Sequence, residues 1–395
     1  MEFAPRTKSR TRCKPYACVP FNHGSFDPRS SSTREAAAVA EKPRLLAPSG
    51  PWLFSRSGDL FVFAGPALLA FALVAYAASS GLLVGDAPAW TFFAIVLAVD
   101  VAHVWSTLFR VYFDGAEFER KRALYVGAPI AVYVAGVMLH AVSSLAFWRV
   151  LAYVAVFHFM RQQVGWMRLY DRRDAEAKPW QRRLDSWTIY ACCLYPLLWW
   201  HAHLPRAFDW FLEGDFVVGL SSSLLPPAAL IYGLTLAAFA ATHALRVFRG
   251  QGQPGKIVLA IATAACWYGG IVAFDSDLVF TVTNVLLHGV PYFLLTFRYG
   301  RKRAAEGAPL LRRLLGGAAV RAGFAFAAIV LVLATVEEGI WDRYVWHEHA
   351  GVFGNGASLG DLTLALLVPL LSLPQAVHYV LDGVVWRGAS NPLLR

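Results

Sequence analysis

The chain has 395 residues, of which 57% are hydrophobic and only 16% are charged. A soluble globular protein is roughly 45–50% apolar and roughly 25% charged, so this composition excludes an ordinary soluble protein and predicts one solvated mostly by lipid. The formal net charge is +10 at pH 7, and its distribution along the chain decides whether it indicates nucleic acid or a membrane.

The chain begins with a polar segment. Residues 1–50 are rich in Arg, Lys, Ser, Pro and Ala and contain no apolar run as long as that of a signal peptide. We predict a disordered basic N-terminal tail here, with an organelle transit peptide as the alternative. Residues 51–395 are predicted to form a single transmembrane helical domain.

Ten segments that follow the tail are long and apolar enough to cross a bilayer, which takes about 20 residues of helix. The sequence therefore predicts an all-α fold, a polytopic transmembrane helical bundle of about ten spans. We place the spans, in chain order, at 60–84, 88–113, 122–143, 146–170, 185–204, 222–248, 255–274, 277–299, 318–336 and 361–386.

The basic residues of the loops orient this bundle. If the N-terminus is cytoplasmic, the loops after even-numbered spans carry most of the Lys and Arg residues, whereas the opposite loops carry only Arg149, Arg206 and Arg343. Cytoplasmic loops are enriched in Lys and Arg, so both termini are predicted to be cytoplasmic and the protein to lie in a cell inner membrane. The basic charge then faces anionic lipid headgroups, and no nucleic-acid partner is expected.

Four predicted spans each carry one histidine near the middle of the span: His103 in the second, His158 in the fourth, His288 in the eighth and His378 in the tenth. An ionisable side chain inside the bilayer is costly unless it has a partner, so such residues are functional candidates. The four spans run in the same direction, and the histidines lie within roughly 10 Å of one another in depth. They can therefore converge on a metal ion if the spans are neighbours.

Two aspartates share helix faces with these histidines. Asp100 lies three residues before His103, and Asp382 lies four residues after His378, so each carboxylate is one turn from an imidazole. A carboxylate in that position can bind the metal or orient the imidazole. We predict Asp100 as a further metal ligand and Asp382 as a catalytic residue.

Three polar residues follow His158 by about one turn: Arg161, Gln162 and Gln163. Arg161 and Gln162 are predicted to be catalytic, by binding a headgroup or an anionic intermediate. Neutral imidazoles with carboxylates suit iron, with zinc or copper as alternatives. Because the centre would open into hydrocarbon, the expected substrate is a lipid-soluble small molecule.

One histidine on each of several spans resembles the architecture of the Brp/Blh-type β-carotene cleavage enzymes. The resemblance covers His103, His158, His288 and His378. It implies a non-haem iron held by intramembrane histidines. The segments FHFMRQQ and VHYVLDGVVWR look like those of bacterial polytopic membrane proteins, a likeness that names no activity.

The sequence is therefore compatible with three functions. The first is a metal-dependent oxidoreductase, the second is a proton-coupled transporter that uses the same His, Asp and Arg residues, and the third is a non-catalytic membrane scaffold. The oligomeric state stays open. We expect Asp215, Glu337, Glu338 and Asp342 to belong to a solvated outer surface, and His243, near the inner end of its span, to reach the interface.

Overall fold

The computed structural model describes residues 50–387. Every regular element in this range is a helix, which confirms the predicted all-α class. The predicted tail lies outside the described residues, apart from its last position.

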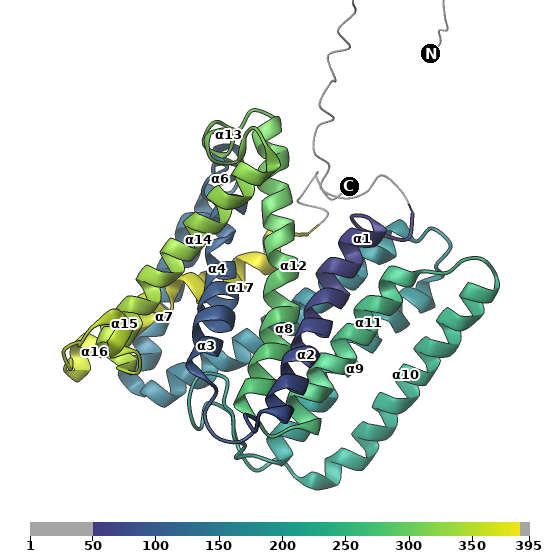
Figure 1. Ribbon diagram of the computed structural model, residues 1–395, viewed down its shortest axis with the longest axis horizontal. Coiled ribbons are helices and arrows are strands. Elements are labelled where there is room, and N and C mark those ends of the chain that lie inside the picture. Colours follow the sequence, from purple (N-terminus) through teal and green to yellow (C-terminus); the bar gives the residue numbers. More distant parts are fainter. Residues whose placement is uncertain (1–49, 388–395) are drawn as a thin grey trace, which may run out of the picture. The chain divides into compact units, whose positions relative to one another are not determined.

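The helices follow the predicted spans closely (Figure 1). The first part of the chain forms α1 (Arg56–Asp59), η1 (Leu60–Ala64), α2 (Gly65–Ser79), α3 (Ala89–Thr91), η2 (Phe92–Val101), α4 (Ala102–Trp105), α5 (Thr107–Arg110), α6 (Gly115–Arg120), α7 (Arg122–Val142), α8 (Ser144–Arg173) and α9 (Pro179–Ala202). The second part forms η3 (Ser222–Leu224), α10 (Leu225–Phe248), α11 (Pro254–Trp267), η4 (Tyr268–Ala273), α12 (Asp277–Ala305), α13 (Pro309–Leu315), α14 (Ala319–Trp341), η5 (Asp342–Trp346), α15 (Ala350–Phe353), α16 (Asp361–Leu371) and α17 (Leu373–Val385).

Within the described residues, eight helical segments are long and apolar enough to cross a membrane, so the chain is a multi-pass membrane protein. They are Arg56–Ser79, Ala89–Arg110, Arg122–Val142, Ser222–Phe248, Pro254–Ala273, Asp277–Ala305, Ala319–Trp346 and Asp361–Val385. The other two predicted spans are α8 and α9, which have 30 and 24 residues and are not among these eight segments. The count of ten spans stays a prediction.

Proline and serine mark the starts of several helices. Pro179, Pro254 and Pro309 lie in the first turns of α9, α11 and α13, where a backbone N–H has no partner inside the helix. Ser143, between α7 and α8, is extended, and its hydroxyl accepts a hydrogen bond from the backbone of Ala146 at 3.2 Å. The chain therefore reverses direction at a single residue between these two long helices.

The last predicted span is broken in the middle. α16 ends at Leu371 and α17 begins at Leu373, with Pro374 in its first turn. Proline has no backbone N–H to donate to the preceding turn, so the two helices do not continue as one. As a result α17 packs against α4, α7 and α8, whereas α16 packs mainly against α7.

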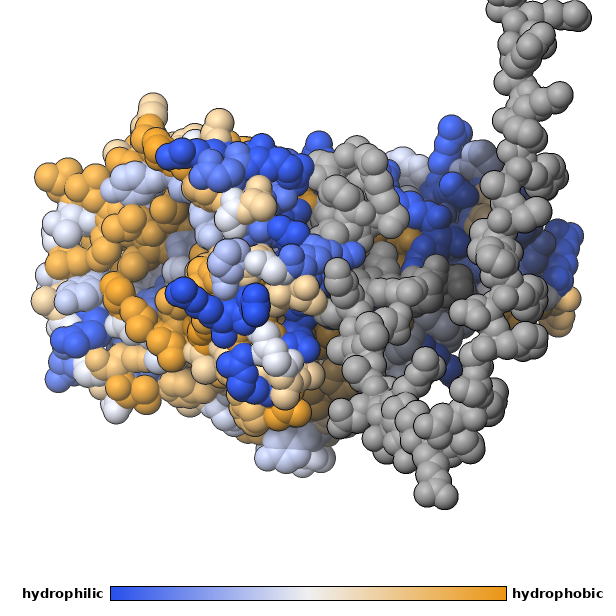
Figure 2. Space-filling model, turned by 90° about the horizontal axis from the view of Figure 1, so that it is seen from above, coloured by the Kyte–Doolittle hydropathy of each residue, from blue (hydrophilic) through white to orange (hydrophobic). Residues whose placement is uncertain are grey.

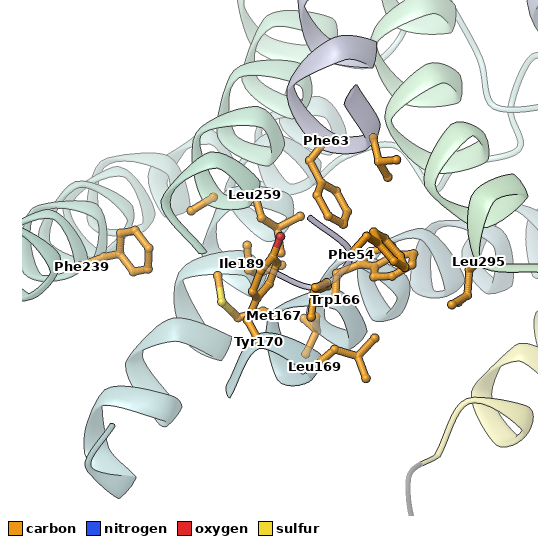
Figure 3. Packing of buried hydrophobic residues seen from close by; sticks show 14 of the residues in the cluster. Phe54, Phe63, Trp166, Met167, Leu169, Tyr170, Ile189, Phe239, Leu259 and Leu295 are labelled. Carbon is orange, nitrogen blue, oxygen red and sulfur yellow. The ribbon is translucent and has the colours of Figure 1, made fainter. Parts of the chain in front are cut away.

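α8 and α12 form the middle of the bundle. α12 packs against α2, α5, α11 and η2, and α8 packs against α7, α9, α11 and α17. Figure 3 shows one of the buried clusters, in which Phe63 and Trp166 meet edge to face with ring centroids 5.3 Å apart. Such clusters hold the central helices in fixed positions.

The surface agrees with a membrane protein. Exposed apolar side chains cover the peripheral helices, and they include Met138 of α7 and Leu234 of α10. Figure 2, which views the bundle from the end where α6 and α13 lie, shows hydrophilic side chains gathered on that face and apolar side chains along its left flank. This distribution is what a lipid-facing flank and a water-facing end require.

Candidate metal centre

Each of the four histidines comes from a different helix. His103 lies on α4, His158 on α8, His288 on α12 and His378 on α17, and all four are buried. α4 packs against α12 and α17, and α8 also packs against α12 and α17, so the four helices surround one point. One ligand nitrogen from each imidazole lies within 4.8 Å of the other three. The predicted convergence of the four side chains is therefore observed.

The four rings form a closed cycle. Ring centroids are 4.7 Å apart between His103 and His288, 5.0 Å between His288 and His158, 4.7 Å between His158 and His378, and 5.0 Å between His378 and His103. Neighbouring rings meet edge to face. The Nε2 atoms of His103 and His288 are 3.0 Å apart, and those of His158 and His378 are 3.1 Å apart. The Nε2 atoms thus point toward the middle of the cycle.

Neighbouring groups hold the outer nitrogens of two imidazoles. His103 Nδ1 lies 3.2 Å from the carbonyl oxygen of Val99. A carbonyl oxygen only accepts, so His103 donates from Nδ1 and keeps a lone pair on Nε2. His378 Nδ1 lies 2.8 Å from the hydroxyl of Thr107, which is 3.3 Å from the hydroxyl of Tyr292. Such contacts fix the ring orientation that a metal-binding imidazole needs.

His288 is positioned by packing. Its ring stacks on Phe159 with centroids 3.6 Å apart and an interplanar angle of 11°. Among the described residues its Nδ1 has no hydrogen-bond partner. A Cβ atom added at the next residue, Gly289, would lie 2.7 Å from Cγ1 of Val99. Only glycine therefore allows α12 to approach η2 closely enough for His288 to reach His103.

Two carboxylates lie beside the imidazoles. Asp100 Oδ1 is 3.7 Å from His103 Nδ1, and Asp382 Oδ2 is 3.7 Å from His158 Nδ1. Asp382 thus pairs with a histidine on another helix rather than with His378 on its own. Within the part of the chain that the structure describes, the convergent group consists of imidazoles alone, so Asp100 lies next to it rather than within it.

Arg161 and Gln162 are placed differently from each other. Arg161 is exposed and donates a hydrogen bond to the hydroxyl of Tyr190 on α9. Gln162 is buried one turn after His158, and neither atom of its amide has a partner within residues 50–387. An unpartnered buried amide is costly, so Gln162 has hydrogen-bonding capacity that no described residue uses.

Two residues of the centre were not among the predicted ligands or catalytic residues. Thr107 lies four residues after His103, and Tyr292 lies four residues after His288. Four residues is one helical turn, so each shares a face with its histidine. The spacing rule that identified Asp382 could have identified both hydroxyls.

The expectation of a solvated outer surface was wrong for four acids. Asp215, Glu337, Glu338 and Asp342 are all buried. α14 continues past its predicted end at position 336, so both glutamates belong to a packed helix. Trp105 donates to Glu337 at 2.6 Å, which gives this carboxylate a partner inside the bundle.

A second buried polar cluster joins α8, α9, α10 and α11. The Lys256 ammonium donates to carboxylates of Asp171, Asp174 and Asp185 at 2.7–2.9 Å. Arg246 donates to both oxygens of Asp174. Burial alone would raise the pKa of Asp174, but the hydrogen bonds from Arg246 and Lys256 hold it below its ordinary value.

His243 belongs to the same cluster. It is buried, and its Nε2 lies 2.9 Å from Asp185 Oδ1. The expectation that it reaches the interface was therefore wrong. Position along a helix sets the depth of a side chain, but the packing of α10 on α9 sets the direction in which it points.

The centre is a buried group of four imidazoles in a multi-pass helical protein, and its donor set can hold a metal ion. Comparison of the chain with models of known protein families, with curated proteins and with solved structures finds no match in any of the three.

Proposed function

We propose that this protein is an integral membrane oxidoreductase in which His103, His158, His288 and His378 hold one iron ion. The observation that carries the proposal is the convergence of four buried ligand nitrogens from four helices to within 4.8 Å. Imidazole lone pairs directed at one another in an apolar interior are unfavourable unless a cation or proton lies between them. A bound cation supplies that partner for all four at once.

The donor set suits iron. Imidazole nitrogens are ligands of iron, zinc and copper, and they bind such ions at about 2.0–2.1 Å. The two close nitrogen pairs, 3.0 Å and 3.1 Å apart, are each within reach of one ion. Zinc and copper are the alternatives, and elemental analysis distinguishes the three.

The nearby carboxylates favour a divalent ion. Four neutral imidazoles leave the charge of such an ion uncompensated, and net charge inside hydrocarbon is costly. Asp100 and Asp382, each 3.7 Å from an imidazole nitrogen, would offset two positive charges. A carboxylate behind an imidazole also makes that imidazole a stronger ligand.

The surroundings favour a lipid-soluble substrate. The centre lies between apolar helices, and the Phe159 ring covers one face of His288 and keeps water from it. An iron ion held here would supply one-electron redox chemistry with dioxygen. The unpartnered amide of Gln162, one turn from His158, would bind a polar group of the substrate. The resemblance to the Brp/Blh-type β-carotene cleavage enzymes, which consists of one histidine on each of several spans, supports an isoprenoid as the substrate class.

Metal analysis tests the proposal. The full chain is purified in detergent, loaded anaerobically with ferrous iron and examined by elemental analysis and equilibrium titration. We expect about one iron ion per chain, and replacement of any of the four histidines by alanine should weaken binding at least about 10-fold. The matched control is His203→Ala, because His203 contacts Trp199 of its own helix.

Two results would count against this function. A chain that holds no stoichiometric metal, either as purified or after loading, would remove the metalloprotein proposal. If the metal-free protein instead moved protons or solutes in proteoliposomes, and this flux depended on His288 and Asp382, the protein would be a transporter rather than an oxidoreductase.

A further inference from the structure

A line of aromatic rings leads from the four-histidine centre to one end of the bundle. The ring centroids of His378 and Tyr292 are 4.9 Å apart, and those of Tyr292 and Trp386 are 6.3 Å apart, with both pairs edge to face. Trp386 directly follows α17 and is half-buried, so its indole reaches the edge of the described protein. The single ring of Tyr292 therefore connects the buried centre to a tryptophan that a water-soluble partner can approach.

Arg110 holds the Trp386 ring in position. Its guanidinium carbon lies 5.1 Å from the centroid of the Trp386 ring and 4.4 Å from that of Tyr299, so the cation contacts two aromatic faces. Arg110 also donates to the carbonyl oxygen of Val385 at 2.8 Å and to the Tyr299 hydroxyl at 3.2 Å. These contacts fix the distance between Trp386 and Tyr292, which matters because the rate of electron transfer falls steeply with distance.

The protein is basic where this line of rings ends. The loop charges predict that this end of the bundle is cytoplasmic. Arg110 lies 3.3 Å from Glu117, which accepts a hydrogen bond from Arg120 at 3.0 Å. Lys121 lies near enough to Arg110 and Arg120 to be repelled by both, and the next residue, Arg122, is exposed. A positive surface beside the tryptophan attracts a partner whose own surface is acidic.

A second line of rings leaves the centre toward the opposite end of α12. His288 stacks on Phe159, and the Phe159 and Trp210 ring centroids are 5.0 Å apart. Trp210 lies 5.7 Å from Phe280, near the start of α12, whereas Trp386 lies 6.0 Å from a tyrosine near its end. The side chains close to one another around Trp210 are acidic: Asp209, Glu213, Asp215 and Asp277. An acidic partner is repelled there, so charge selects the line that ends at Trp386.

We propose that Tyr292 and Trp386 carry single electrons to the four-histidine centre from an acidic one-electron carrier protein that docks over Trp386. This inference rests on the proposed function, because it needs a redox-active ion at the centre. In each transfer the reduced carrier loses one electron and is oxidised, and the ferric ion gains that electron and becomes ferrous. No covalent bond forms or breaks. The two rings bridge the distance between the carrier and an ion that the surrounding helices keep out of its reach.

Anaerobic stopped-flow mixing tests the proposal. The full chain, loaded with ferric iron in detergent, is mixed with reduced plant-type [2Fe–2S] ferredoxin as an acidic one-electron donor, and ferredoxin oxidation is followed by absorbance. We expect one electron to be transferred per bound iron ion. The transfer should slow as salt is added, because salt screens the attraction between the two proteins.

One charge reversal tests where the carrier docks. Arg122→Glu should slow ferredoxin oxidation several-fold at low ionic strength, since the basic surface speeds the encounter of the two proteins. The matched control is Arg249→Glu, which makes the same charge change at an exposed position at the end of α10, at the edge of the bundle (Figure 1). The control should leave the rate unchanged.

Substitutions of the two tryptophans test the route. Trp386→Leu removes the ring, so the fast phase of ferredoxin oxidation should be lost while the affinity for ferrous iron stays at the wild-type value. Trp386→Phe keeps an aromatic ring and should restore part of the rate. Trp210→Leu interrupts the second line of rings and should leave the rate unchanged.

The possible failures can be distinguished. A chain that binds no iron in the titration, before any carrier is added, would remove the proposed function and this inference together. If iron binds, a wild-type rate in Trp386→Leu would remove the route and leave the metal centre intact. Slow transfer in both Trp386 variants together with weaker iron binding would show that Trp386 is only structural. Equal slowing in Arg122→Glu and Arg249→Glu would show that the carrier does not dock over Trp386.

Discussion

Replacing Gly289 by alanine tests whether the close approach of α12 to η2 sets the geometry of the four histidines. The added Cβ would lie 2.7 Å from Cγ1 and 3.2 Å from the carbonyl oxygen of Val99. Carbon atoms in contact are about 3.5–4.0 Å apart, so the two helices must separate by roughly 1 Å. His288 precedes Gly289, and His103 follows Val99 by one turn. Separating the helices therefore moves apart the Nε2 atoms of His288 and His103, which are 3.0 Å apart.

The change has two effects that can be separated. Metal–nitrogen distances tolerate deviations of only about 0.2 Å, so a displacement of roughly 1 Å should weaken iron binding at least about 10-fold. Overpacking by itself costs about 1–3 kcal/mol of folding stability. The packing cost is present with or without metal, whereas the loss of affinity appears only as a smaller stabilisation by iron.

Thermal unfolding in detergent, measured with and without ferrous iron, distinguishes the two effects. Gly289→Ala should melt below the wild-type protein in both conditions and should gain less from iron. Gly165→Ala on α8 is the control, because nothing lies within 4 Å of its added Cβ and alanine is favoured over glycine in a helix by up to about 1 kcal/mol. Wild-type melting and wild-type iron affinity in Gly289→Ala would refute the reasoning.

Three further changes have defined outcomes. Thr107→Val removes the hydroxyl that lies 2.8 Å from His378 Nδ1, so the iron affinity measured by titration should fall about 10–100-fold. The control is Thr335→Val, at an exposed position, which should leave the iron affinity unchanged. Lys256→Met leaves three buried carboxylates without their shared cation and should lower the free energy of unfolding by about 3–5 kcal/mol. An unchanged melting temperature would show that the cluster does not stabilise the fold. Burial alone would raise the pKa of Asp114, but hydrogen bonds from Arg303 hold it below its ordinary value. The ionised Asp114 therefore stabilises the fold fully above about pH 4, and this stabilisation is lost as the pH falls through the lowered pKa. When the pH is lowered from about 7 to about 2, the melting temperature of Asp114→Asn should fall less than that of the wild-type protein.

The helices could be predicted because their signal is local. The span predicted at 122–143 is observed as Arg122–Val142, and the span predicted at 222–248 is observed at Ser222–Phe248. A run of about 20 apolar residues in lipid must satisfy its own backbone hydrogen bonds, and a helix does so within the segment. Neighbouring helices are not needed for these backbone hydrogen bonds, so the sequence alone was enough to predict the helices.

The four histidines could be predicted as a group from depth alone. Each is a single imidazole near the middle of an apolar span, and helix rise converts residue number into depth. Depth does not show which spans are neighbours or how each is rotated. The structure decided both, through the packing of α4, α8, α12 and α17 and through the glycine at 289 that brings two of these helices together.

Other features of the site depended on rotation about the helix axis. Arg161 and Gln162 are adjacent in sequence, yet one is exposed and the other is buried with an unpartnered amide. Asp382 contacts a histidine on a different helix from the one its spacing indicated. From its own residues a helix determines where it lies along the membrane normal, because lipid and water select its apolar length. Which of its faces meets a partner depends on side chains that other helices supply, so only the tertiary structure determined the contacts of the centre.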